Sequence, residues 1–189
     1  MGVTMPRWPD LYLMRHGQTV WNAEGRMQGR SDSPLTPLGR QQARRQAQLA
    51  RGIDAARFAS PAGRAVETAR IVFGDQDFRQ DARLHEIDIG DFTGRFRSDL
   101  RAERPDLFRQ GGLGWYDHAP GGEGFAGLEA RVRDFLNDLE GPALIVTHGI
   151  TLRMLRLIAM DLPLSRLEEM PVAQGAVHRV GRGSHLMLV

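Results

Sequence analysis

The chain has 189 residues, of which 41% are hydrophobic and 25% charged, and these values are ordinary for one globular α/β domain. All 25 basic residues are arginine, but the net charge is only +2, so charge gives no strong argument for nucleic acid or an anionic membrane as a partner. The absence of cysteine excludes disulfides, a thiolate nucleophile and a cysteine metal site, and with no signal-like segment at the N-terminus it favours a reducing cytoplasm.

The first predicted element is a short buried strand, Leu11–Met14, which stops at the ionisable sequence Arg15-His16-Gly17. Residues 17–34 are rich in Gly, Asn, Gln, Ser and Asp and predict a loop over the carboxyl end of that strand. Thr36 as N-cap and Pro37 at the first helical position then predict a helix that ends near Gly52.

A second short strand is predicted at residues 56–59, ending at Ser60-Pro61, and a helix follows over residues 64–72. Arg64 falls in the first turn of that helix. The backbone N–H groups and the positive end of the helix dipole favour an anion at this position. Arg64 is therefore a candidate to bind phosphate.

Residues 84–94 alternate apolar and acidic side chains before glycine, which indicates an extended segment opening into a loop. In such a segment Glu86 and Asp88 face the same way, so either carboxylate could reach a site. Residues 95–122 predict a short helix and a mobile cover in which substrate selectivity would lie. Trp115 and Tyr116 in this cover could either pack or contact substrate.

A core helix over residues 123–140 precedes a buried strand at 143–146, which ends in Thr147-His148-Gly149. Residues 150–162 then form an amphipathic helix whose charged residues argue against a membrane span, and the tail adds one or two edge strands. The alternation of strands and helices predicts a three-layer α/β/α sandwich with a mostly parallel central sheet. We expect a single domain over residues 1–189, with the cover at about 95–122.

Ligands of such sheets bind at the carboxyl ends of the strands, where Arg15, His16, Arg64 and His148 are expected to meet. Two imidazoles, two guanidiniums and a nearby carboxylate, without a thiol or an aspartate-rich cluster, indicate a small dianion handled without a metal. Arginine forks match phosphate oxygens and stay charged at any working pH. Phosphate is the anion that this set favours.

Five sequence blocks occur in one order along most of the chain: Leu13 to Asn22, Ser33 to Gly39, Ser60-Pro61 with Arg64, Thr68 and Ala69, Leu84 with Glu86 and Gly90, and Thr147-His148-Gly149. In these blocks the chain resembles the histidine phosphatase superfamily, in its phosphoglycerate mutase-like branch. The resemblance implies that Nε2 of His16 is the nucleophile and that Glu86 is the proton donor, with Asp88 as the alternative. It also implies that Arg15, Arg64 and His148 bind the phosphoryl oxygens, and that Asn22, Gln28 and Gly149 contact the substrate.

Some positions differ from many relatives: Gln18 replaces a glutamate, and residues 92–94 and 122–124 read Phe-Thr-Gly and Gly-Glu-Gly. None of these removes a phosphate ligand, but they leave the substrate open. The favoured interpretation is a metal-independent phosphomonoesterase acting on a small phosphorylated metabolite without a cofactor. A cofactor-dependent phosphoglycerate mutase and a non-catalytic phospho-ligand-binding module are the alternatives, and RNA binding is a weaker one because aromatic interleaving is absent. The sequence carries no signal about oligomeric state.

Overall fold

A six-stranded sheet forms the centre of the computed structural model, which describes residues 8–108, 112–181 and 183–189. The strand order is β3-β2-β4-β1-β5-β6. The four strands from β3 to β1 are parallel, whereas β5 and β6 are antiparallel to their neighbours. The strands are Leu11–Arg15 (β1), Ala56–Ala59 (β2), Arg79–Gln80 (β3), Ala143–Thr147 (β4), Val177–Gly181 (β5) and Ser184–Leu188 (β6).

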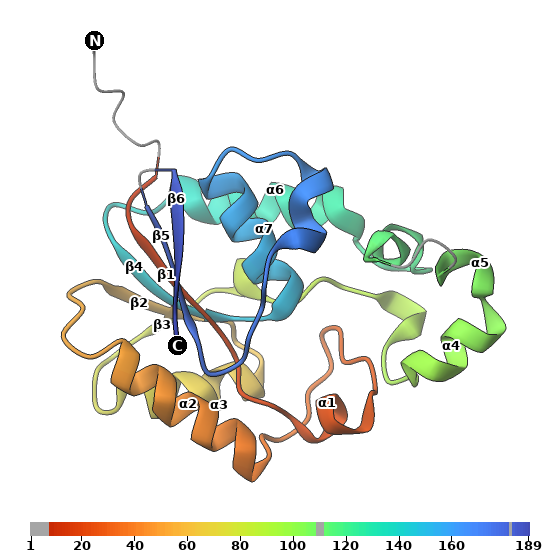
Figure 1. The fold of residues 1–189 in the computed structure, drawn as a ribbon, viewed down its shortest axis with the longest axis horizontal. Helices are drawn as coiled ribbons and strands as arrows, with labels where there is room; N and C mark the ends of the chain where they lie inside the picture. The colour runs from red at the N-terminus through yellow and green to blue at the C-terminus, as the bar shows by residue number, and fades with distance from the viewer. Residues whose placement is uncertain (1–7, 109–111, 182) are drawn as a thin grey trace.

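Helices cover both faces of the sheet, with α2 and α3 on one side and α6 and α7 on the other (Figure 1). The predicted three-layer sandwich with a mostly parallel sheet is therefore confirmed. The α-helices are Val20–Glu24 (α1), Pro37–Leu49 (α2), Gly63–Phe73 (α3), Arg97–Glu103 (α4), Pro105–Phe108 (α5), Gly124–Asn137 (α6) and Gly149–Ala159 (α7). Single 3-10 segments occur at Ala82–Leu84, Gly90–Phe92, Gly114–His118 and Leu164–Glu169.

The central strands are apolar on both faces because both faces are covered. Leu11 and Leu13 of β1 pack in the cluster beneath α6 and α7, whereas Met14 packs in the cluster beneath α2 and α3. Strand β4 divides in the same way, with Ile145 in the first cluster and Val146 in the second. The short uninterrupted apolar runs in the sequence are thus explained by two cores on opposite sides of one sheet.

Helix α2 begins where the sequence predicts it, because the Thr36 hydroxyl accepts a 3.0 Å hydrogen bond from the Gly39 N–H and Pro37 follows the cap. The first turn of α2 lies directly on the segment after β1. A Cβ atom at Gly39 would stand 2.1 Å from the Gln18 carbonyl oxygen. Glycine at position 39 therefore permits this close approach.

One local prediction was wrong. The segment predicted as a loop over residues 17–34 contains α1, whose N-terminus is closed by reciprocal hydrogen bonds between Thr19 and Asn22. In the segment predicted to open from an extended piece into a loop over residues 84–94, residues 85–89 lie outside regular structure and a 3-10 turn follows at Gly90–Phe92. Helix α1 was missed because a single turn of helix produces too short a pattern to be seen in a sequence.

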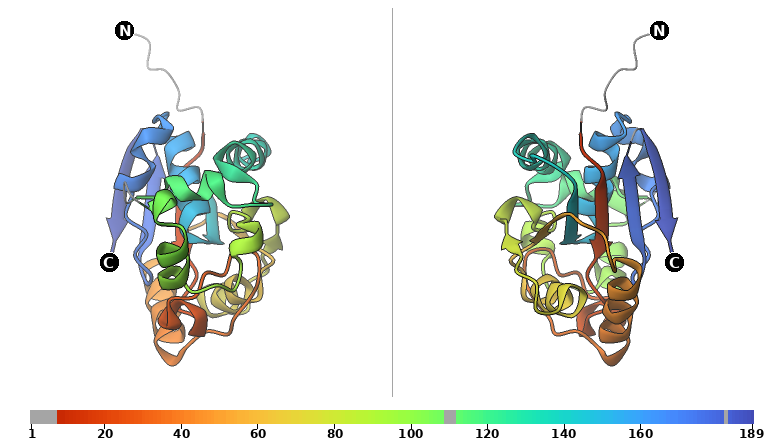
Figure 2. Two further views of the ribbon diagram at one scale, coloured as in Figure 1. Left: turned by 90° about the vertical axis from the view of Figure 1, so that its right-hand side faces the viewer. Right: turned by 90° about the vertical axis from the view of Figure 1, so that its left-hand side faces the viewer.

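The tail forms two strands, as predicted, with β6 at the edge of the sheet. The predicted cover contains α4, α5 and the 3-10 turn at Gly114–His118, and residues 109–111 of it lie outside the described residues. Helices α4 and α5 stand apart from the sheet, on the side of the molecule where α1 lies (Figures 1 and 2).

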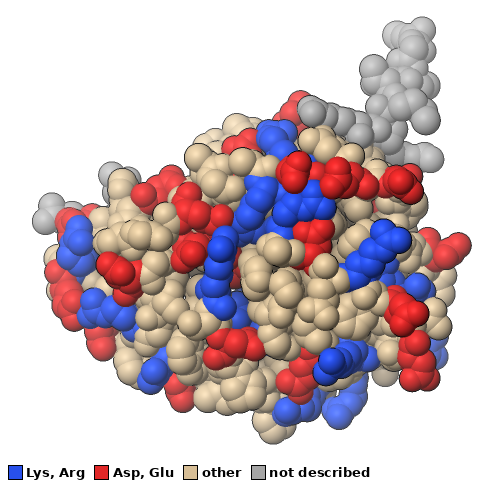
Figure 3. All heavy atoms as spheres, turned by 180° about the vertical axis from the view of Figure 1, so that it is seen from behind, with Lys and Arg blue, Asp and Glu red and all other residues tan. Residues whose placement is uncertain are grey.

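The surface shown in Figure 3 carries basic and acidic side chains next to one another, with an arginine band bordered by acids near its middle. Among the residues that the structure describes, no helix is long and apolar enough to cross a lipid bilayer.

Candidate active site

The two histidines that end β1 and β4 lie side by side. Arg15 and Thr147 are partners in the parallel register of the two strands, and the His16 N–H donates to the Thr147 carbonyl at 2.9 Å. The imidazole rings of His16 and His148 meet edge to face, with their centroids 5.1 Å apart. The adjacent strands thus bring both predicted histidines to one point at the carboxyl edge of the sheet.

The hydrogen bonds of His16 define its tautomer. Nδ1 lies 2.8 Å from the Gly17 carbonyl oxygen, which can only accept, so Nδ1 carries the proton. Nε2 lies 3.3 Å from Nε of Arg64, which can only donate, so Nε2 presents its lone pair. His16 therefore holds an unprotonated, nucleophilic nitrogen against a guanidinium.

Burial keeps this imidazole neutral. Removal from water, followed by the charges of Arg64 and Arg15, lowers the pKa of His16 well below its ordinary value, and the hydrogen bond to Gly17 only partly opposes this. The His148 side chain is also fully buried, and burial followed by the charge of Arg64 lowers its pKa well below the ordinary value. A neutral His16 is the form that can attack an electrophile.

The backbone of the loop before α2 holds the guanidinium of Arg64 in place. Its Nη2 donates to the Gly29 carbonyl at 2.8 Å and its Nη1 to the Ser31 carbonyl at 2.6 Å. Nη1 also pairs with the Asp32 carboxylate at 3.1 Å. These contacts fix a buried cation beside Nε2 of His16, where it can meet an anionic group.

Arg15, at the end of β1, and Glu86, in the segment of residues 85–89, both lie beside the start of α7. A Cβ atom at Gly149 would lie 3.5 Å from Nε of Arg15 and 3.7 Å from Oε2 of Glu86, so both side chains adjoin this glycine. Oε1 of Glu86 accepts hydrogen bonds from the backbone N–H groups of Ile150 and Thr151 at 3.2 and 3.1 Å. The carboxylate thus sits at a helix N-terminus, which favours negative charge there.

Asp88, the alternative to Glu86, has different partners. The Asp88 carboxylate accepts from the Gly90 N–H at 2.9 Å and lies 3.8 Å from Nε of Arg30. Glu86, and not Asp88, lines the cavity that contains His16.

That cavity measures about 220 Å³, and its lining combines ionisable side chains with aromatic ones. Arg15, His16, Arg64 and Glu86 lie in its wall. The remaining lining residues are Asn22, Gly25, Arg26, Met27, Gln28, Gly29, Ile89, Arg97, Trp115 and Tyr116. The predicted site residues are therefore gathered in one place. His148 and Gly149 are not among the lining residues, but the His148 ring contacts that of His16 and Gly149 adjoins Arg15 and Glu86.

His148 is held by a residue that sequence reasoning did not assign to the site. Its Nε2 lies 2.7 Å from the hydroxyl of Ser60, which is fully buried at the end of β2, while its Nδ1 has no hydrogen-bond partner. The position of Ser60 after a strand was the available signal, since β2 neighbours β4 in the sheet.

Three amide side chains line or support the cavity. Gln28 donates from Nε2 to the Thr19 hydroxyl at 2.8 Å, which leaves its buried Oε1 without a partner. Oδ1 of Asn22 accepts from the Thr19 N–H at 3.2 Å. Gln174, which was not predicted, donates to the His16 carbonyl at 3.1 Å and reaches Oδ1 of Asn22 at 3.4 Å.

Trp115 and Tyr116 both line the cavity, and their rings stack with centroids 3.7 Å apart. Burial and the negative charge of Glu86 raise the pKa of Tyr116, so the phenol stays protonated. The indole Nε1 of Trp115 is buried and has no hydrogen-bond partner among the residues that the structure describes. Both aromatic residues of the predicted cover therefore belong to the wall of the cavity that contains His16.

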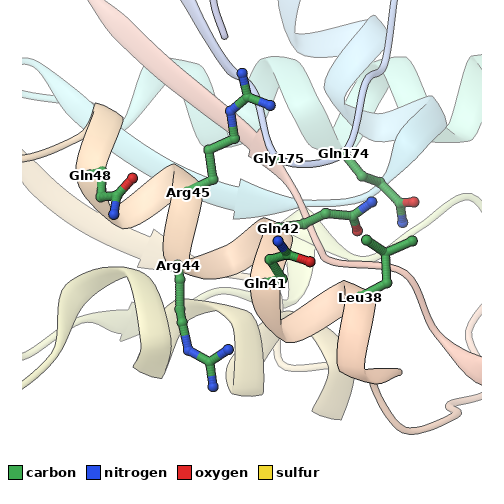
Figure 4. Close-up of a pocket in the computed structure, with 8 residues that line it drawn as sticks. All are labelled: Leu38, Gln41, Gln42, Arg44, Arg45, Gln48, Gln174 and Gly175. Atoms are coloured by element: carbon green, nitrogen blue, oxygen red, sulfur yellow. The ribbon is translucent and has the colours of Figure 1, made fainter.

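A larger groove of about 600 Å³ lies over α2, where Gln174 and Gly175 face the helix (Figure 4). Its lining consists of Leu38, Gln41, Gln42, Arg44, Arg45, Gln48, Gln174 and Gly175, a set without a histidine or a carboxylate. It therefore lacks the imidazole and the carboxylate that line the smaller cavity. In the described parts of the chain, no group of three or more histidine, aspartate or glutamate residues is arranged to hold a metal ion.

Comparison with known proteins agrees with this geometry. The family model of the histidine phosphatase superfamily (branch 1) matches residues 11–186. A protein of Enterobacter sp. (strain 638) named "Probable phosphoglycerate mutase GpmB" is 41% identical over 163 residues, which are 82% of this chain and 76% of that protein. The YhfR structure of Bacillus stearothermophilus has a TM-score of 0.79 and 37% identity, covering 96% of both chains. The alpha-ribazole phosphatase structure of Shigella flexneri has a TM-score of 0.81 and 28% identity, covering 95% of both.

Proposed function

The chain belongs to the histidine phosphatase superfamily (branch 1), and from that premise we propose that it is a metal-independent phosphomonoesterase acting on a small phosphorylated metabolite. The observation that carries the proposal is the unprotonated Nε2 of His16, buried 3.3 Å from Nε of Arg64. The proposed nucleophile therefore lies beside a cation that can bind the group under attack. Similar proteins include phosphatases and a protein named as a probable mutase, so the chain is an enzyme of phosphate-ester chemistry.

In the first proposed step, the Nε2 lone pair of His16 attacks phosphorus and the bond from phosphorus to the leaving oxygen breaks. Glu86 enters this step with a proton on Oε2 and gives that proton to the leaving oxygen, and a phosphohistidine remains. Arg15, Arg64 and His148 bind the equatorial phosphoryl oxygens. Such donors stabilise a loose phosphoryl transition state by their position and charge, which is the role that metal ions fill in other enzymes.

In the second step, the Glu86 carboxylate takes a proton from water and the resulting hydroxide attacks phosphorus. The bond between Nε2 and phosphorus breaks, and phosphate leaves. Oε1 of Glu86 is occupied by the N–H groups at the start of α7, whereas Oε2 accepts only one bond, from Ile150. Oε2 is therefore the oxygen that we assign to proton transfer, and its general acid–base role is worth roughly 100- to 10,000-fold in rate.

The outer cavity is proposed to hold the leaving group. Asn22, Gln28 and the backbone at Gly149 supply further polar contacts, and the buried Oε1 of Gln28 lacks a partner that a substrate hydroxyl would provide. Trp115 and Tyr116 then limit the size of the leaving group. We propose that residues 95–122 act as a cover within a single domain, and that the enzyme is cytoplasmic, in line with a sequence that contains no cysteine.

Phosphoglycerate mutase activity is the second candidate, and the 41% identity to the Enterobacter protein favours it. A mutase would transfer the phosphoryl group from His16 to a bound hydroxy acid in place of water. A coupled assay should detect no interconversion of 2- and 3-phosphoglycerate with bisphosphoglycerate present. Interconversion faster than phosphate release would establish the mutase instead.

The proposed activity is tested by hydrolysis of p-nitrophenyl phosphate in the presence of a chelator. We expect turnover that persists in chelator and disappears in His16→Ala. His118→Ala is the matched control, because His118 is exposed on the Gly114–His118 turn. Unchanged turnover in His16→Ala would refute the proposal, and binding of phosphate without any turnover would indicate a non-catalytic phospho-ligand module.

A further inference from the structure

Glu86 lies in a segment that has no regular structure of its own, since residues 85–89 follow one 3-10 turn and precede another. Its side chain is held from α7, as described above. Something else must hold its backbone, because a carboxylate anchored only at its tip can still shift along the reaction axis. The Thr147 and Thr151 hydroxyls donate to the Leu84 and His85 carbonyls at 2.8 and 2.7 Å, and the contacts to the Glu86 carbonyl itself and to the residues after it come from α6 and its N-cap.

Two side chains of α6 and its N-cap provide these contacts. Nη1 of Arg131 donates to the Arg83 carbonyl at 2.6 Å, and Nη2 donates to the Glu86 carbonyl at 3.2 Å. Oε1 of Glu123 accepts from the Asp88 N–H at 2.8 Å, and the Glu123 N–H donates to the Asp88 carbonyl at 3.2 Å. Hydrogen bonds therefore hold the segment before Glu86, at Glu86 and after Glu86.

The Arg131 and Glu123 side chains also bind each other. Arg131 Nε and Nη2 meet the two oxygens of Glu123 at 3.0 and 2.7 Å, a bidentate pair. The side chains are only 14% and 17% exposed, so water screens the pair weakly. A planar guanidinium can serve one carboxylate and two carbonyls at once, which a lysine ammonium at a single point cannot do.

We propose that Arg131 and Glu123 are positioning residues for proton transfer by Glu86. They fix the backbone of Glu86 so that Oε2 stays at the distance from the leaving oxygen at which a proton can pass. This inference rests on the proposed role of Glu86 as the acid. It matters because a misplacement of about 1 Å in a catalytic group can cost on the order of 100-fold in rate.

The test uses the dependence of the rate on the leaving group. p-Nitrophenolate departs without a proton, whereas the alkoxide of glycerol 2-phosphate needs one. We expect Arg131→Lys to lower kcat/KM for glycerol 2-phosphate by about 10- to 100-fold, within the range of general acid catalysis. Its kcat/KM for p-nitrophenyl phosphate should stay within about threefold. Glu123→Gln provides a second variant with the same expected pattern.

Arg133→Lys is the matched control, because Arg133 lies on the same helix but pairs with Glu129 at the surface. Arg133→Lys should leave kcat/KM unchanged for both esters. Thermal unfolding should show that each variant is folded. In a Glu86→Gln background, Arg131→Lys should add no further selective loss, since a positioning residue acts only through the group it positions.

Equal losses on the two esters in both Arg131→Lys and Glu123→Gln would overturn the inference, as would a full additional loss in the Glu86→Gln background. These results leave the proposed function intact if Glu86→Gln is itself selective against glycerol 2-phosphate. If Glu86→Gln lowers kcat/KM equally for the two esters, both the assignment of Glu86 as the acid and the positioning role of Arg131 and Glu123 are refuted. Turnover that survives His16→Ala would instead refute the proposed function.

Discussion

Acidification should destabilise the folded chain, because three histidines are buried as neutral imidazoles. His16, His148 and His178 are each at most 3% exposed. Burial, followed in each case by a nearby arginine charge, lowers the pKa of all three, and for His178 to about 3. In the unfolded chain the same side chains have pKa values near 6.5.

Proton linkage gives the sign and the size of the change in the free energy of unfolding with pH. Below about pH 6.5 the unfolded chain binds protons on these imidazoles that the folded chain does not bind, so the free energy of unfolding falls as pH falls. Between about pH 7.5 and pH 5.5, one such histidine costs on the order of 1 kcal/mol. Three together cost a few kcal/mol, which is a large part of the roughly 5–15 kcal/mol that typically stabilises a protein.

The assay is urea unfolding at about pH 7.5 and about pH 5.5. His178→Gln should reduce the difference between the two pH values by on the order of 1 kcal/mol, since one of the three histidines is gone. His118→Gln, at an exposed position, should leave the difference unchanged. A free energy of unfolding that is equal at both pH values, or higher at the lower one, would refute the reasoning.

Three further results are expected from the geometry. Arg64→Gln should lower kcat/KM for p-nitrophenyl phosphate by about 100- to 1,000-fold, because it removes the cation beside the attacking nitrogen, and a loss under threefold would contradict this. Glu86→Gln should slow hydrolysis of glycerol 2-phosphate by at least about 100-fold, whereas Asp88→Asn should change it by less than about threefold; the reverse order would transfer the acid role to Asp88. Gly39→Ala, whose Cβ would meet a backbone oxygen at 2.1 Å, should lower the unfolding free energy by about 1–3 kcal/mol in thermal unfolding, but Gly141→Ala, with nothing within 4 Å, should not.

The elements on which the site depends could be predicted because their signals are local. An apolar run that ends in His16, and another that ends in His148, identify two strand ends without knowledge of the fold. Thr36 with Pro37 identifies the start of α2 for the same reason, since capping involves only the adjacent residues. Arg64, in the first turn of α3, could likewise be predicted, because it comes shortly after the preceding strand in the sequence.

The parts that could not be predicted depend on contacts between distant residues. Ser60 meets His148 across 88 positions of sequence, and Gln174 meets the His16 carbonyl across 158. The difference between Glu86 and Asp88 also depends on distant residues. The N–H groups of α7 that bind the Glu86 carboxylate lie more than 60 positions from it in the sequence. No spacing rule encodes such pairs, so the supporting contacts of the site emerge only from the folded chain.

The most direct test of the account is the covalent trapping of phosphate on His16. The enzyme would be mixed briefly with p-nitrophenyl [32P]phosphate, denatured in alkali, in which phosphohistidine survives, and digested for peptide mapping. We predict that the label lies on the peptide that contains His16, is released by acid, and is absent from His16→Ala. Label on another residue, or steady turnover without any trapped label, would contradict a phosphohistidine at His16.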